Sequence, residues 1–89
     1  MVVINGHLPR PLSSLKPGEE GVIDSVQTSP ETRRKLMEMG IGPGERIRFV
    51  RSSPFGDPNV FELLKCRLAL RKSESDRIIL KPLTPSFAG

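Results

Sequence analysis

Hydrophobic and polar residues alternate most clearly in the segment 45–52 of the chain. On an extended backbone, Ile47 and Phe49 fall on one side there and Arg46 and Arg48 fall on the other. This period of two predicts a half-buried β-strand. Apolar runs bounded by turn-forming residues predict four more strands, which cover residues 21–27, 59–64, 67–71 and 78–80.

The first of these strands departs from strict alternation. Val22, Ile23 and Val26 are its apolar residues. Because the segment is β-branched and follows a glycine, the irregular spacing predicts a β-bulge rather than a helix. Single helical turns are expected at 12–15 and at 73–76, where Ser73 would supply the capping hydroxyl.

A longer helix is predicted between the first two strands, from Pro30 to Met39. Ser29 is suited to accept from an unpaired backbone amide, and Pro30 at the first helical position loses no needed donor. Leu36 and Met39 lie three apart and define an apolar face. We interpret Met37 and Met39 as core-filling residues rather than soft metal ligands.

The helix must end within the segment 40–44, since a strand begins directly after it. Gly40 occupies the position where a left-handed C-cap residue is expected, and Ile41 can fold back on the last apolar turn. Gly42, Pro43 and Gly44 prevent continuation, because proline lacks an amide donor and glycine admits unusual backbone angles. These glycines and Pro43 therefore predict a structural turn.

Five short strands with one inserted helix predict a mainly β fold, a small and strongly bent barrel. We divide the chain into an extended N-terminal arm at 1–11, the barrel domain at 12–82 and a flexible C-terminal tail at 83–89. Prolines interrupt the arm, and the tail has little apolar content. With 89 residues, the core is limited and an elaborate active site is not expected.

The chain has one cysteine, Cys66, and one histidine, His7. An intrachain disulfide is therefore impossible, and a reducing, cytoplasmic location is the simplest expectation. No apolar run approaches the length of a membrane span, so membrane insertion is not expected. The sequence offers no nucleophile elbow and no phosphate-binding lysine after its glycines, and the protein is not expected to be an enzyme.

No metal-ligand cluster follows from the spacing of donor residues. Transition metals favour three or four converging nitrogen and sulfur donors, and Cys66 is only a weak candidate ligand at a predicted turn. The expected cofactor is none, or at most a weakly bound divalent transition metal.

Charge is unevenly distributed along the chain. Residues 1–45 carry five Lys or Arg and six Asp or Glu, whereas residues 46–89 carry nine and four, a balance of +5. The basic half raises the alternative of a nucleic-acid-binding barrel that uses its strand edges, namely Arg46, Arg48, Arg51, Arg67, Arg71 and Lys72. Single-strand binders usually add aromatic stacking platforms. The chain has no Trp or Tyr, and Phe49 and Phe61 are predicted to be in the core, so stable nucleic-acid binding is not expected.

Three segments in order carry a family resemblance. Leu36 to Gly44 resembles the "L-x-E-x-G-[hydrophobic]-x-P-G" segment of the ferrous iron transport protein A (FeoA) family. Pro54 to Pro58 is similar to the family's loop, and Leu68 to Glu74 is similar to its "L-A-L-R-x-x-E". Lys65 stands where the family commonly has a glycine, which leaves that turn geometry open.

The resemblance implies an SH3-like barrel that supports ferrous iron transport. Its expected partner is a membrane ferrous iron transporter with a cytoplasmic GTP-binding domain, and self-association is possible. The proposed contact residues are Arg33, Arg34 and Met37 on the helix and Phe55 in the proline loop, which together offer charged and apolar anchors. The alternative is that Met37 and Phe55 only cover the edges of the core.

Overall fold

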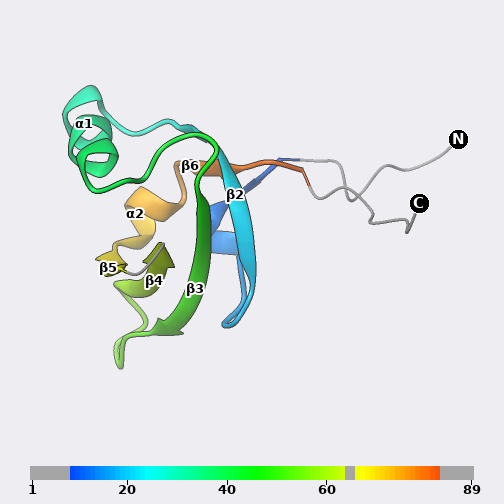
Figure 1. The fold of residues 1–89 in the computed structure, drawn as a ribbon. Helices are drawn as coiled ribbons and strands as arrows, with labels where there is room; N and C mark the ends of the chain where they lie inside the picture. The colour runs from blue at the N-terminus through cyan, green and yellow to red at the C-terminus, as the bar shows by residue number, and fades with distance from the viewer. Residues whose placement is uncertain (1–8, 64–65, 83–89) are drawn as a thin grey trace, which may run out of the picture.

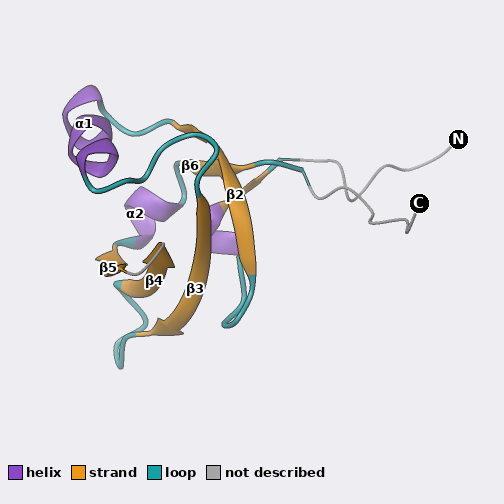
Figure 2. Cartoon of the chain, in the orientation of Figure 1, coloured by secondary structure: helices purple, strands orange, loops and turns teal. Residues whose placement is uncertain are grey.

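The strands form one antiparallel sheet that curls on itself (Figure 1), in a computed structural model that describes residues 9–63 and 66–82. The strand order is β1-β6-β2-β3-β4-β5. In chain order the elements are β1 (Arg10–Pro11), the 3-10 turn η2 (Leu12–Ser14), β2 (Glu20–Val26), α1 (Pro30–Glu38), β3 (Arg46–Ser52), β4 (Asn59–Leu63), β5 (Cys66–Leu70), α2 (Lys72–Ser75) and β6 (Ile78–Leu80). Figure 2 separates these helices and strands by colour.

The mainly β class and the inserted helix are confirmed. All five predicted strands are present as β2 to β6, with ends shifted by one residue at most. The two-residue strand β1 extends the sheet beside β6, so Arg10 and Pro11 pair with it, although they were assigned to the arm. The predictions for the rest of the arm, including His7, for the Lys65 turn and for the tail lie outside the described residues.

Strand β2 joins the two halves of the sheet because it pairs on both sides. Its first three residues pair with β3, and its later residues pair with β6. The register with β6 shifts between Ile23 and Ser25, which confirms the predicted bulge. Since a bulge bends the strand that carries it, this irregularity allows β2 to turn from one partner to the other.

The core lies inside the curl of the sheet. Its alternating residues were correctly predicted: Ile47 and Phe49 from β3 face Phe61 and Leu63 from β4, and all four are buried. The Phe49 and Phe61 rings lie 5.2 Å apart between centroids. The other buried apolar side chains are Leu12, Leu15, Ile23, Val26, Leu36, Ile41, Leu70, Ile78 and Leu80.

Helix α1 begins and ends as the sequence indicates. The Ser29 hydroxyl accepts from the Thr32 amide (3.3 Å), which provides the predicted N-cap. At the other end, the Gly40 amide donates to the Met37 carbonyl (3.0 Å) and the Ile41 amide donates to the Leu36 carbonyl (2.9 Å). These two bonds make a Schellman motif, which requires the left-handed conformation that Gly40 adopts (φ +94°).

The prediction that Met37 and Met39 fill the core is wrong. Their exposed fractions are 54% and 53%, and Leu36 is the buried side chain of α1. The reason is positional, because α1 stands at one end of the barrel instead of lying across it (Figure 1), and one turn is enough to attach it. Helix α1 therefore presents most of its surface to solvent.

The predicted cap at Ser73 is also wrong. Helix α2 begins one residue earlier, and the Glu74 carboxylate accepts from the Arg71 amide (2.9 Å). Asp76 instead accepts from the Ser13 hydroxyl of η2, and this hydrogen bond is the main reason that the pKa of Asp76 is lowered, with Lys72 adding to the effect. The Ser13–Asp76 contact ties η2 to α2.

Candidate partner-binding surface

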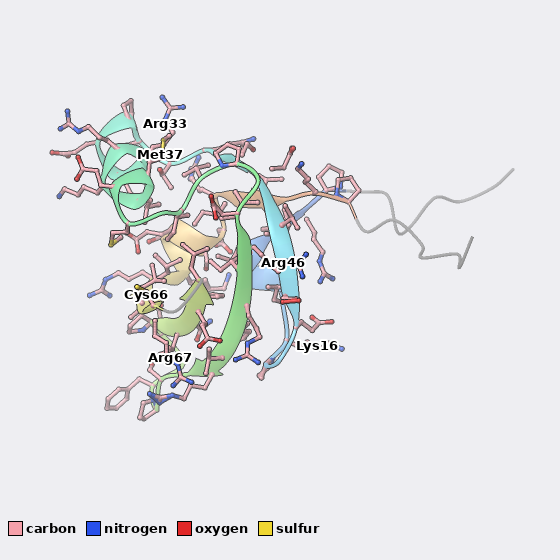
Figure 3. The ribbon with its side chains drawn as sticks, viewed as in Figure 1. Lys16, Arg33, Met37, Arg46, Cys66 and Arg67 are labelled. Atoms are coloured by element: carbon pink, nitrogen blue, oxygen red, sulfur yellow. The ribbon has the colours of Figure 1, made fainter. Side chains whose placement is uncertain are left out.

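The exposed face of α1 brings together three of the four predicted contact residues. Arg33 and Met37 are four residues apart and Arg34 and Met37 are three apart, so all three occupy neighbouring positions on the helix. They line a shallow groove together with Pro30, Glu31 and Glu38. Arg33 and Met37 lie beside each other in Figure 3. This helix face combines a long apolar side chain with two guanidinium groups.

A second hollow continues this face toward the barrel. Arg33 and Met37 line it with Val26 at the end of β2 and with Pro43 in the turn before β3. Met37 also approaches the turn closely, since a Cβ placed on Gly42 would lie 3.9 Å from the Met37 Cγ. The turn therefore forms one wall of this second hollow, beside the α1 face.

The turn itself agrees with the sequence in part. Gly40 and Gly44 both have positive φ angles, +94° and +90°. Gly42 is not among the positive-φ glycines, so the expectation of unusual angles holds for two of the three. The Gly44 amide donates to the Ile23 carbonyl (2.7 Å), which fixes the start of β3 against β2.

Phe55 does not join the α1 face. It lies in the loop between β3 and β4, whereas the turn beside α1 precedes β3 (Figure 1). Seven residues of strand separate the two, or roughly 20 Å at about 3.3 Å per residue. The expectation of one surface formed by Arg33, Arg34, Met37 and Phe55 is thus corrected to two separate surfaces. Phe55 is 94% exposed and does not cover a core edge.

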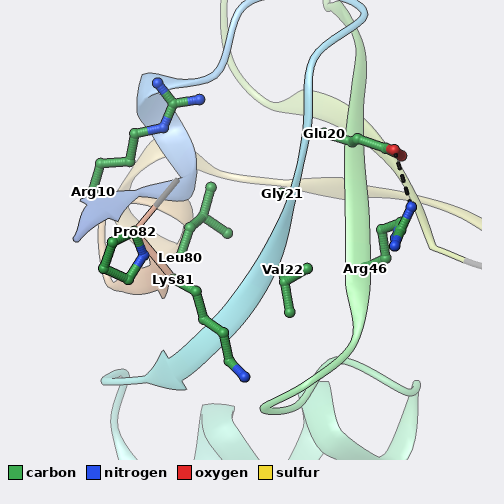
Figure 4. Close-up of a pocket in the computed structure, with 8 residues that line it drawn as sticks. All are labelled: Arg10, Glu20, Gly21, Val22, Arg46, Leu80, Lys81 and Pro82. Carbon is green, nitrogen blue, oxygen red and sulfur yellow. Dashed lines mark hydrogen bonds and ion pairs between the residues drawn. The ribbon is translucent and has the colours of Figure 1, made fainter. Parts of the chain in front are cut away.

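A cavity of about 340 Å³, which the sequence did not indicate, lies between β2 and the end of β6 (Figure 4). Gly21, Val22, Leu80 and Pro82 form its apolar floor. A Cβ on Gly21 would lie 2.9 Å from Leu80 Cδ1, so any larger residue there would require the Leu80 side chain to shift. A glycine inside a strand is the sequence signal that could have indicated it.

Charge at this cavity is largely compensated. Arg46 faces Glu20 (3.5 Å) and Arg10 faces Glu19 (3.7 Å). Lys81 is the remaining cation of the lining, and none of the ion pairs found between described residues includes it. The cavity therefore offers little excess charge for recognition, and the α1 face is the stronger candidate.

Ion pairs also reduce the basic strand face that suggested nucleic-acid binding. Arg48 and Arg67 both reach Glu62, at 2.6 Å and 3.7 Å, and Lys72 reaches Asp76 at 3.3 Å. Phe49 and Phe61 lie in the core, as predicted. Neither ring is therefore available as a stacking platform for bases.

Cys66 lies on the first residue of β5, opposite Leu63, and its side chain is exposed. The expectation that it sits in a turn is corrected by this position. In residues 9–63 and 66–82, no three His, Cys, Asp or Glu side chains form a group able to hold a metal ion. Cys66 stays only the weak candidate ligand that the sequence indicated.

The fold defines a class of protein, a small β-barrel domain with an exposed helix at one end. None of the described helices is long and apolar enough to span a membrane. Residues 10–82 match the FeoA domain, and the chain belongs to the FeoA family. This family is associated with ferrous iron transport and consists of small accessory domains, and it is not a known enzyme family.

Two solved FeoA structures share the fold. The solution structure of FeoA from Chlorobium tepidum is 30% identical, with a TM-score of 0.77 over 89% of this chain and 84% of that one. The crystal structure of Stenotrophomonas maltophilia FeoA complexed with zinc is 33% identical, with a TM-score of 0.69 over 80% of this chain and 88% of that one. The latter is described as a prokaryotic SH3 domain protein, which agrees with the predicted SH3-like barrel.

A relative with a known role contains the same domain in a longer chain. The Fe(2+) transport protein A/Fe(2+) transporter FeoB fusion protein of Porphyromonas gingivalis is 30% identical over 67 residues. The match covers 75% of this chain but only 8% of the fusion protein. This chain therefore matches only a small part of the fusion protein's length.

Proposed function

We propose that this protein supports ferrous iron uptake by docking the α1 face on the cytoplasmic GTP-binding part of a membrane ferrous iron transporter. The observation that carries the proposal is the relative in which an FeoA domain and the FeoB transporter are one polypeptide. Fusion keeps two domains at high effective concentration, which favours a contact that is weak between separate chains. Such a contact would be the function of the separate protein.

Helix α1 supports the proposal because its exposed side chains are of the kinds that carry binding energy. Met37 supplies an adaptable apolar anchor, and Arg33 and Arg34 supply planar donors suited to carboxylates. The attached groove is shallow and the helix has only nine residues. We therefore expect a small, transient interface whose association rate falls as salt rises.

The first experiment deletes the gene for this protein in its source cell and follows ferrous iron uptake. Reduced uptake, restored by the wild-type chain, supports the proposal. Normal uptake in the deletion would reject it.

The second experiment locates the docking surface with two matched variants of the full chain. Arg34→Glu with Met37→Asp alters the α1 face, whereas Arg51→Glu with Phe55→Asp makes the same kinds of change at the other end of β3. Binding to the purified cytoplasmic part of the transporter is measured by calorimetry. We expect the helix variant to bind at least about tenfold more weakly, since hot-spot losses exceed about 1.4 kcal/mol.

The loop variant serves as the control and should bind the transporter domain like the wild type. Loss of binding only in the loop variant would assign docking to the Phe55 end and reject the α1 surface. Circular dichroism must show both variants folded, which is expected because all four altered side chains are exposed.

A further inference from the structure

The loop between β3 and β4 holds an aromatic side chain away from the barrel. Phe55 is 94% exposed at its tip. Across the base of the loop, the Ser53 amide donates to the Pro58 carbonyl (3.2 Å), and the Gly56 amide donates to the Ser53 carbonyl (2.9 Å). These bonds fix the loop, so Phe55 is presented without a large ordering cost on contact.

A link to α2 adds to this fixation. The Asp57 carboxylate accepts from the Lys72 amide (2.9 Å), which ties the loop to the start of α2. The carboxylate is thus engaged with the backbone beside the tip. The exposed Phe55 ring is therefore carried by a loop that is held both at its base and by its link to α2.

Cations flank this loop on both sides. Ser52, Asn59 and Leu70 lie in one row across β3, β4 and β5. Arg51 precedes the first of these residues and Arg71 follows the last, so each lies one residue from the row that closes the loop. Both are exposed, and neither takes part in the ion pairs found between described residues.

We propose that the Phe55 loop contacts an anionic lipid surface, with Phe55 at the headgroup boundary and Arg51 and Arg71 against lipid phosphates. Phe is among the apolar side chains that bury at the boundary between headgroups and acyl chains, and basic residues near an anionic surface each add attraction. The loop projects beyond the ends of β3 and β4 (Figure 1), and the other exposed large apolar side chains of the described chain, Met37 and Met39, are on α1 and its C-cap. A protein interface usually needs a broader cluster of anchors, whereas a lipid boundary accepts a single ring.

The contact would be weak and peripheral. One ring and two cations fall short of the two signals that hold proteins stably on membranes. It does not depend on the proposed function, since it needs lipid and no transporter. A protein already bound to a membrane transporter would nevertheless gain from it, because a second weak contact adds avidity.

The test uses the absence of Trp and Tyr from the chain. Phe55→Trp adds one fluorophore at the tip, and Met37→Trp adds one on α1 as the matched control. Each full-length variant is titrated with vesicles of phosphatidylcholine and phosphatidylglycerol, and with vesicles of phosphatidylcholine alone. With the anionic vesicles, we expect the emission of the Phe55→Trp variant to shift to the blue, reversed by salt, and that of the Met37→Trp variant to stay unchanged.

Removing the two cations tests the electrostatic part. Arg51→Gln with Arg71→Gln in the Phe55→Trp chain should weaken partitioning by about 25-fold, at about fivefold per cation. Emission of the Phe55→Trp variant that stays unchanged at millimolar anionic lipid would overturn the proposal. An equal shift in the Met37→Trp variant would also overturn it. So would a shift of the loop fluorophore caused only by the transporter's cytoplasmic part, which would identify a protein site.

Discussion

The end of α1 allows a sharp test of backbone strain. Gly40 has a φ of +94°, and both bonds of the Schellman motif depend on that conformation. In Gly40→Val, a β-branched side chain must adopt a conformation that costs L-residues about 1–2 kcal/mol. The new Cβ would also lie 3.3 Å from Leu63 Cδ2, in the core.

These two terms set the expected magnitude. Leu63 is only 1% exposed, so it has little room to move, and the tight contact adds on the order of 1 kcal/mol to the strain. We expect the free energy of unfolding to fall by about 2–3 kcal/mol, the sum of the strain and the contact. For a domain of this size, such a loss lowers the melting temperature by roughly 8–24 °C.

Two control variants separate the causes, and urea unfolding followed by circular dichroism measures all three. Gly44→Val has nearly the same φ (+90°) but no heavy atom within 4 Å of its Cβ, so it should show the strain alone. Gly42→Val, without a positive φ, should be close to neutral. A Gly40→Val loss below about 0.5 kcal/mol, or an equal loss in Gly42→Val, would refute the reasoning.

The contacts described above make four further outcomes testable. Because Ser13 lowers the pKa of Asp76, that carboxylate stabilises the fold above its ordinary pKa of about 4, and the contribution is lost as pH falls through the lowered value. The free energy of unfolding of Ser13→Ala, measured in urea, should therefore be lower than that of wild type at neutral pH. The two values should converge in acid, and a difference that stays constant with pH would contradict this. Gly21→Val should cost about 1–2 kcal/mol in thermal unfolding by overpacking against the buried Leu80, and an unchanged melting temperature would show that Leu80 can move. Purified protein should contain no stoichiometric iron by elemental analysis, whereas one iron per chain that is lost in Cys66→Ser would establish a thiolate ligand. Mixed-sequence RNA should bind weakly and steeply lose affinity with salt in filter binding, and sequence-selective submicromolar binding would favour the nucleic-acid alternative.

Local rules predicted most of the barrel because its signals are short in range. The alternation of Ile47 and Phe49 identified β3 and its buried face. The sequence Ser29-Pro30 identified the start of α1, and Gly40 followed by Ile41 identified its end. Each signal concerns residues that touch one another along the chain, so tertiary context had little opportunity to override it.

Long-range placement could not be predicted in the same way. The helical spacing of Leu36 and Met39 indicates a shared face, but it does not say how far the helix stands from the core. Met39 became the exposed C-cap residue because the Schellman turn directs the chain back at once. The start of α2 was missed for a different, local reason: Ser73 met the rule for a cap, but the Glu74 carboxylate accepts from the Arg71 amide, which makes Arg71 the N-cap instead.

The distance between α1 and Phe55 gives the two proposals a joint consequence. Strand β3 is a rigid spacer between them, because it is paired on both sides and buries Ile47 and Phe49. A surface that docks on a cytoplasmic domain and a tip that touches lipid can therefore act together only if that domain holds the barrel with β3 directed toward the membrane. When two weak contacts are fixed in this way, the first raises the effective concentration for the second, and the overall affinity exceeds that of either contact alone. A flexible link between them would lose most of that gain in affinity. Loss of either contact should then weaken binding to transporter in vesicles, and only loss of the α1 contact should weaken binding to the isolated cytoplasmic part.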